Sequence, residues 1–288
     1  MATFYNRATL SYNGTVKSSN ITSGEIIEVL SAEKSAVSES YSQGSENVYL
    51  ISLVNTGSTC YSGLTVTDDL GAYSFGEENG MVVPLTYREG SLIYYVNGVR
   101  QPAPEVTGSS PLTITGINVP AGGNALIVYA ASANSCAPMG NEAVITNTAV
   151  ISGAGFESIT ALADVSYMDG IDLTISKSLS PAAVEENGEV TYTFIIRNFG
   201  TAPAEAGDNV IFTDIFTPSL NGITAEFNGA PWVSGENYTY DPCSGEFNSL
   251  AGQLTVPAAS FTQDEATGEW SAQAGSSTLV IKGRIASV

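Results

Sequence analysis

Two sets of polar residues in this sequence have the composition needed for a self-forming amide cross-link. Each set combines a Lys, an Asp and an Asn, and the residues are Lys34, Asp68 and Asn147 in the first set and Lys177, Asp214 and Asn6 in the second. A neutral Lys amine is a nucleophile, and a protonated Asp that hydrogen-bonds an Asn carboxamide makes the amide carbon electrophilic. Attack with loss of ammonia would join the Lys and Asn side chains. Asp68 and Asp214 would promote the reaction, which needs no metal or cofactor.

The residues around these groups predict that they lie on the inward faces of β-strands. Lys177 falls between Ile175 and Leu179 at a period of two, and Asn147 is placed in the same way among apolar residues. The adjacent acid Asp69 is a second candidate in the first set, but it points outward by the same parity. Burial lowers the pKa of a Lys and raises that of an Asp, which favours the reactive forms. The alternative is a buried ion pair with the Asn as a neighbour, or a Lys and an Asn that reach the rim.

The spacing of the sets indicates an internal repeat. Lys34 and Asn55 are 21 residues apart, and so are Lys177 and Asn198, each Asn opening an Asn-x-Gly turn. The Lys to Asp separations are 34 and 37 residues in the two copies. We therefore expect two homologous domains with the same arrangement of strands.

The opening strand of the sequence is a second copy of a strand found in the middle. The stretch FYNRATLS at 4–11 matches ITNTAVIS at 145–152. The first domain extends 113 residues from Lys34 to Asn147, whereas 111 residues follow Lys177, so we expect the second domain to lack its last strand. An incomplete sandwich exposes an apolar groove and open strand edges. Another copy of the protein could fill that groove by donating its first strand.

The composition is typical of an all-β protein, and the length suits two cores. Short apolar stretches separated by turns such as Asn97-Gly98 predict β-sandwiches. The expected organisation is a donor strand at 1–12, a linker at 13–25, a first sandwich at 26–152, a second linker at 153–170 and an incomplete second sandwich at 171–288.

Charge and cysteine content exclude several classes of protein. Nine Lys and Arg against 29 Asp and Glu argue against nucleic acid and anionic membranes as partners. No apolar run is long enough for membrane insertion, and MATFYNRATL does not resemble a secretory signal. Without His or a CxxC pair, a zinc site or thiol enzyme is not expected. Cys60 and Cys136 could pair and leave Cys243 single, or all three could be free thiols.

The motifs LTISKSLSP, VTYTFIIRNFGTAPA, VIFTD and ITNTAVISG resemble the bacterial domain-of-unknown-function eleven repeat, an immunoglobulin-like module of surface proteins. The resemblance covers nearly the whole chain from Ile26 onward. It implies immunoglobulin-like sandwiches with internal Lys to Asn isopeptide bonds assisted by an acid, as in related pilin and adhesin domains. Lys34, Asp68 and Asn147 correspond to that triad. The second copy departs from the pattern because no Asn follows Val280.

We therefore expect a structural subunit of an extracellular, pilus-like filament on a bacterial cell or spore surface. Subunits would join head to tail as the N-terminal strand enters the second domain of the next copy, giving an open filament. Isopeptide bonds would form within subunits (Lys34 to Asn147) and between them (Lys177 to Asn6).

Other assemblies and functions are compatible with the same sequence. The first strand could instead fold back within its own chain or exchange in a closed dimer. No nucleophile elbow or phosphate loop favours an enzyme. The alternative function is a monomeric or dimeric adhesin or ligand-binding module whose contact face would use exposed aromatic residues, the candidates being Tyr94, Tyr95, Trp232, Tyr238 and Tyr240.

Overall fold

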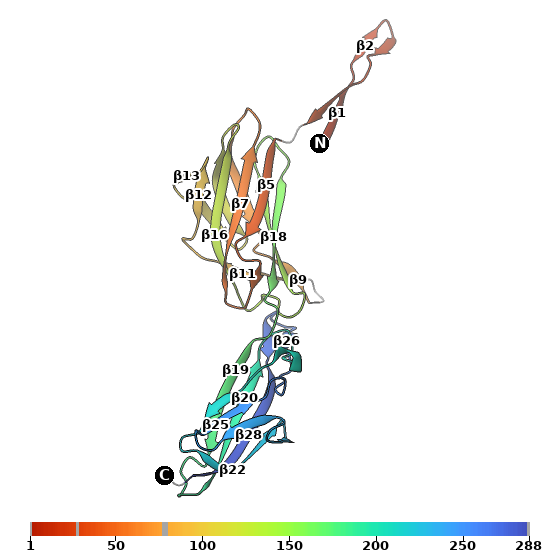
Figure 1. Ribbon diagram of the computed structural model, residues 1–288. Coiled ribbons are helices and arrows are strands. Elements are labelled where there is room, and N and C mark those ends of the chain that lie inside the picture. Colours follow the sequence, from red (N-terminus) through yellow and green to blue (C-terminus); the bar gives the residue numbers. More distant parts are fainter. Residues whose placement is uncertain (1, 27–28, 77–79, 287–288) are drawn as a thin grey trace.

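The computed structural model describes residues 2–26, 29–76 and 80–286, and it has three parts arranged along one axis (Figure 1). A narrow N-terminal ribbon projects from one end, two β-sandwiches follow one after the other, and the C-terminus lies near the far end. The one helical segment in these ranges is the 3₁₀ turn η1 (Ala206–Asp208), and no helix there could cross a membrane. The all-β prediction is confirmed.

Two sheets of the first sandwich face each other across a single core. The first sheet has the order β13 (Val99–Gln101), β12 (Ile93–Val96), β16 (Asn124–Ala133), β7 (Glu46–Asn55) and β5 (Leu30–Ala36), with β11 (Leu85–Tyr87) paired to β16. The second has the order β14 (Glu105–Ser109), β15 (Leu112–Val119), β8 (Tyr61–Asp68), β17 (Val144–Ser152), β18 (Ile159–Tyr167) and β6 (Ser40–Tyr41). A small hairpin of β9 (Tyr73–Phe75) and β10 (Gly80–Val82) lies outside both sheets.

Alternation of apolar and polar residues forms these strands, as the sequence predicts. In β7 and β16 every second side chain is buried, and Tyr49 pairs with Tyr129 at the centre of the core. The turn between β12 and β13 is Asn97-Gly98, with positive φ at both residues. That geometry is the tight hairpin turn that Asn-Gly favours.

The segment 153–170 is not merely a linker. Its residues 159–167 form β18, which pairs antiparallel with β17 along its whole length and buries Ala161, Ala163 and Val165 in the core. The small inward residues of this strand gave a weak apolar pattern in the sequence. The first sandwich therefore ends at β18, and the connection to the second is correspondingly short.

The second sandwich repeats the first sheet in full. The order is β19 (Leu173–Ser180), β20 (Glu189–Asn198), β28 (Gly275–Ile285), β22 (Leu220–Phe227) and β23 (Ala230–Trp232). Its other sheet has three strands, β21 (Thr213–Ile215), β25 (Glu246–Ser249) and β24 (Tyr238–Asp241), which match β8, β15 and β14. No described strand pairs with the second edge of β21, whereas β8 has β17 there. The predicted absence of one strand is therefore too small, because β17 and β18 both lack counterparts.

The N-terminal segment is a two-stranded ribbon and not a strand followed by a linker. It contains β1 (Ala2–Asn6), β2 (Thr9–Tyr12), β3 (Thr15–Ser18) and β4 (Thr22–Ile26), with β1 paired to β4 and β2 to β3. The expected linker at 13–25 thus supplies the return strands. Those residues are mostly polar, and in this structure they pair only within the ribbon, so the sequence gave no core pattern for them.

A hairpin of the second sandwich fixes the contact between the two sandwiches. It consists of β26 (Ser260–Gln263) and β27 (Trp270–Gln273). The Trp270 backbone N–H donates to the Ser135 carbonyl at 2.7 Å, and its indole Nε1 donates to the Tyr73 hydroxyl at 3.2 Å. The Phe261 ring packs edge-on against Tyr167 at 5.6 Å between centroids.

Candidate functional site

Four side chains from four strands meet in the core of the first sandwich. Lys34 on β5 reaches across the core to Asp68 on β8, and its Nζ lies 2.7 Å from Asp68 Oδ2. Both side chains have no solvent exposure. The same carboxylate oxygen accepts a hydrogen bond of 2.6 Å from the Tyr129 hydroxyl, and Asp68 Oδ1 accepts one of 3.1 Å from the Leu70 backbone.

Tyr129 connects the acid to the third residue of the predicted set. The Asn147 side chain on β17 is buried, and its Nδ2 donates to the Tyr129 hydroxyl at 3.0 Å. Asn147 Oδ1 has no hydrogen-bond partner among the described residues. A buried amide oxygen without a partner is costly, so this carbonyl is poised to accept a proton donor.

Burial moves the two ionisable groups toward their neutral forms. Loss of solvation lowers the pKa of Lys34, and the opposing effect of the Asp68 charge does not cancel it. Loss of solvation likewise raises the pKa of Asp68 despite the nearby Lys34 charge and the hydrogen bonds it accepts. Burial also raises the Tyr129 pKa well above its usual value, which keeps the hydroxyl protonated. A free amine beside a protonated acid is the form in which Lys34 can act as a nucleophile.

The second sandwich holds a matching but open pair. Lys177 Nζ on β19 lies 2.5 Å from Asp214 Oδ2 on β21, and their side chains are 43% and 19% exposed. The ammonium also lies over the rings of Tyr192, Phe194 and Phe216 at 4.8 to 5.4 Å. This sandwich therefore has the Lys and the acid of the first site without its enclosure.

Asn6 is the one predicted residue that does not join its set. It ends β1 in the ribbon, it is exposed, and it lies beyond the end of the first sandwich that faces away from the second (Figure 1). Within one chain the Lys177 and Asp214 pair thus has no Asn partner from the ribbon.

Sequence reasoning missed Tyr129. Its inward position in β16 was readable from the alternation of that strand, but Tyr in a core strand is ordinary packing material. Only the contacts from β8 and β17 give its hydroxyl a role. Asp69, the rival acid, faces away from the core, and its Oδ1 accepts from the backbone of Gly71 and Thr148.

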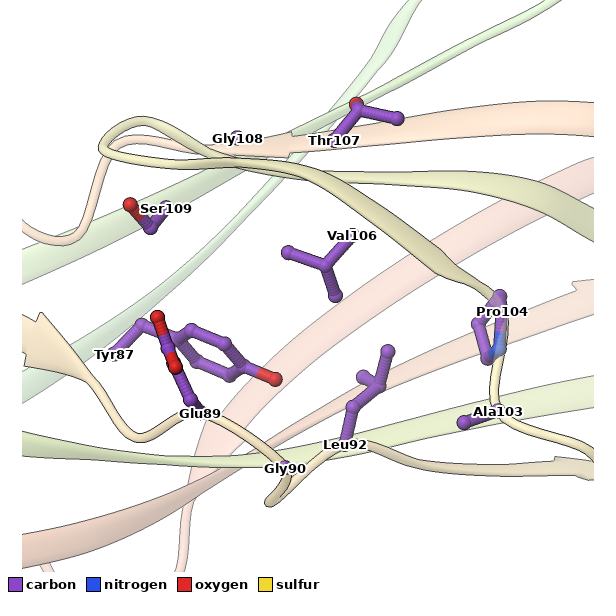
Figure 2. A pocket seen from close by; sticks show the side chains of 10 residues that line it. All are labelled: Tyr87, Glu89, Gly90, Leu92, Ala103, Pro104, Val106, Thr107, Gly108 and Ser109. Atoms are coloured by element: carbon purple, nitrogen blue, oxygen red, sulfur yellow. The ribbon is translucent and has the colours of Figure 1, made fainter.

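The other sequence candidates lie apart from this site. Cys60, Cys136 and Cys243 are free thiols. The five aromatic residues considered for an adhesive face do not form one, since Tyr94 and Tyr238 are buried in different sandwiches. A groove of about 510 Å³ lies at the far edge of the first sandwich, where Figure 2 shows Tyr87, Leu92 and Val106 extending into it. None of the cross-linking candidates lines it.

No protein-family model matches this sequence. No curated protein matches it either.

Solved structures show remote likeness only. The pilus backbone RrgB from Streptococcus pneumoniae is 11% identical with a TM-score of 0.34, and the match covers 85% of this chain and 55% of that one. BcpA, the major pilin subunit of Bacillus cereus, is 11% identical with a TM-score of 0.34 over 95% of this chain and 73% of that one. A type II cohesin dyad from the adaptor ScaA scaffoldin of Acetivibrio cellulolyticus is 10% identical with a TM-score of 0.25, over 89% and 85%. The chain thus spans little more than half the length of RrgB.

Proposed function

We propose that this protein is the structural subunit of an extracellular bacterial filament in which the N-terminal ribbon of one subunit completes the second sandwich of the next. The observation that carries the proposal is a match of register. In the first sandwich Asn147 pairs with Ala163, and in the ribbon Asn6 pairs with Thr22, so both positions differ by 141 residues. The ribbon thus has the pairing of the hairpin that the second sandwich lacks.

The edge of the second sandwich suits this occupant. Ile211 and Ile215, which flank the Asp214 region, are 60% and 61% exposed, and the free edge of β21 offers unpaired backbone groups. A strand added there would satisfy those groups and cover apolar surface. In the first sandwich Ala149 lies opposite Asp68, so the same offset places Ala8 opposite Asp214.

That register brings Asn6 to the place that Asn147 occupies in the first sandwich. The Lys177 amine would attack Asn6 Cγ and form a C–N bond, the Cγ–Nδ2 bond would break, and the amine proton would leave with the amide nitrogen as ammonia. Asp214 would hold and return the proton during attack. Lys34, Asp68 and Asn147 would undergo the same reaction within each subunit. Because donor and acceptor surfaces differ, the contact does not close on itself and gives a filament.

A denaturing gel of the purified protein tests the intermolecular bond. Wild type is expected to give a ladder of multimers that survives boiling with reductant, and Asn6→Ala is expected to abolish it. Asn20→Ala is the matched control, since Asn20 is also an exposed Asn of the ribbon. The bond between subunits is disproved by an unchanged ladder in Asn6→Ala. Electron microscopy of the same samples reports filaments independently, since strand donation can persist without the bond.

A further inference from the structure

The return strand β18 closes the first sandwich over Lys34. It pairs with β17 on one side and with β6 on the other, where Tyr167 lies opposite Tyr41, and it also lies against β5. Its inward residues belong to the same core as the residues that enclose Lys34. Both strands of the hairpin are therefore needed to remove Lys34 from solvent.

The corresponding region of the second sandwich is uncovered. In β5 the residues on the Lys34 side, Ala32 and Ala36, pack against the core. Their counterparts in β19, two residues before and after Lys177, are Ile175 and Leu179, and these are exposed. Large apolar side chains at an edge strand predict a covering element.

We propose that the ribbon enters the neighbouring subunit as a pair of strands, with β1 and β2 along β21 and with the return strand β4 over β19. This inference rests on the proposed filament and specifies its second contact. The register of β4 against β1 is that of β18 against β17. The inserted pair would cover Ile175 and Leu179 and enclose Lys177 as β18 helps to enclose Lys34.

The two faces of β4 are expected to differ in the assembled state. Thr22 lies opposite Asn6 and corresponds to Ala163, which is buried, whereas Ser23 corresponds to Asp164, which is exposed. In the free ribbon Thr22 and Ser23 are both exposed. Only insertion of β4 makes the environments of these two neighbours different.

The test compares Thr22→Glu with Ser23→Glu in the full chain, read by filament yield in sedimentation and by the boiled ladder. Thr22→Glu is expected to reduce both at least about tenfold, since an unpaired carboxylate is strongly disfavoured in an apolar core. Ser23→Glu is expected to assemble as wild type does. Thr22→Val, which keeps the shape of the side chain without charge, is expected to retain assembly.

Equal assembly of both Glu variants would show that the return strand stays outside the acceptor. Equal loss in both would also overturn the proposal, because it shows no difference between the faces. Absence of filaments and ladder in wild type would instead remove the filament itself.

Discussion

Tyr129 and Ile281 occupy equivalent places in the two sandwiches. Tyr129 pairs across the sheet with Tyr49, and Ile281 pairs in the same way with Tyr192. The hydroxyl that links acid and amide in the first site therefore has no counterpart on β28 of the second. The closed site has a connected path from Asp68 through Tyr129 to Asn147, while the second site would rely on direct contact between Asp214 and the incoming Asn.

Tyr129→Phe is expected to slow formation of the Lys34 to Asn147 bond by about 10² or more, the usual effect of removing a group that takes part in proton transfer. The measurement is the mass of refolded protein over time, since each bond removes one ammonia. Tyr49→Phe is the control, because its ring stacks on Tyr129 while both hydrogen bonds of the Tyr129 hydroxyl remain. Equal rates in the two variants would exclude a role for the Tyr129 hydroxyl.

Lys34→Met is expected to make the stability of the first sandwich fall as pH rises. The Asp68 pKa is already raised above 3.8 by burial, and removing Lys34 removes two effects that lower it. A group whose pKa is higher in the folded state binds more protons there, so its stabilisation is full below the unfolded pKa and is lost as pH rises through the folded pKa. At neutral pH the unpaired charge costs about 3–5 kcal/mol.

Urea unfolding from pH 3 upward, on the order of one measurement per pH unit, checks this dependence. The double variant Lys34→Met with Asp68→Asn lacks the isopeptide bond as well but has no charge to bury, so the slope is expected to disappear. A slope of the same size in both variants would assign it to other groups.

Lys177→Ala is expected to change the stability of the unassembled second sandwich by about 1 kcal/mol or less, since half-exposed ion pairs contribute little. Thermal unfolding of the monomer fraction gives this value. The same change in boiled filaments is expected to abolish the ladder. A large loss of monomer stability would mean that the Lys177 and Asp214 pair already supports the core before assembly.

Trp270→Ala is expected to loosen the contact between the two sandwiches, because it removes the indole that bonds to Tyr73. Small-angle X-ray scattering should show a broader range of overall lengths, with both sandwiches still folded. Trp232→Ala is the control, since Trp232 packs on Phe227 inside the second sandwich. An unchanged scattering profile in Trp270→Ala would show that the remaining contacts suffice.

Repeat spacing carried most of what the sequence predicted about the fold. The alternation around Lys177 and the Asn-Gly turn at 97–98 are local patterns, and both gave the observed elements. The return strands β4 and β18 were missed because small and polar residues leave weak apolar periodicity, and their pairing partners decide their structure. Tyr129 was missed for a different reason, since its role depends on contacts from strands distant in the sequence.

The positions of the Lys and Asn residues on opposite edges of each sandwich have a mechanical consequence. With both bonds formed, a pulling force would pass from Asn6 to Lys34, cross the amide to Asn147, continue to Lys177 and enter Asn6 of the next subunit. Residues 35–146 lie outside that path, as does the second sandwich beyond Lys177. Tension could then extend only the segments 6–34 and 147–177, so such a fibre would resist stretching without relying on the unfolding stability of either core.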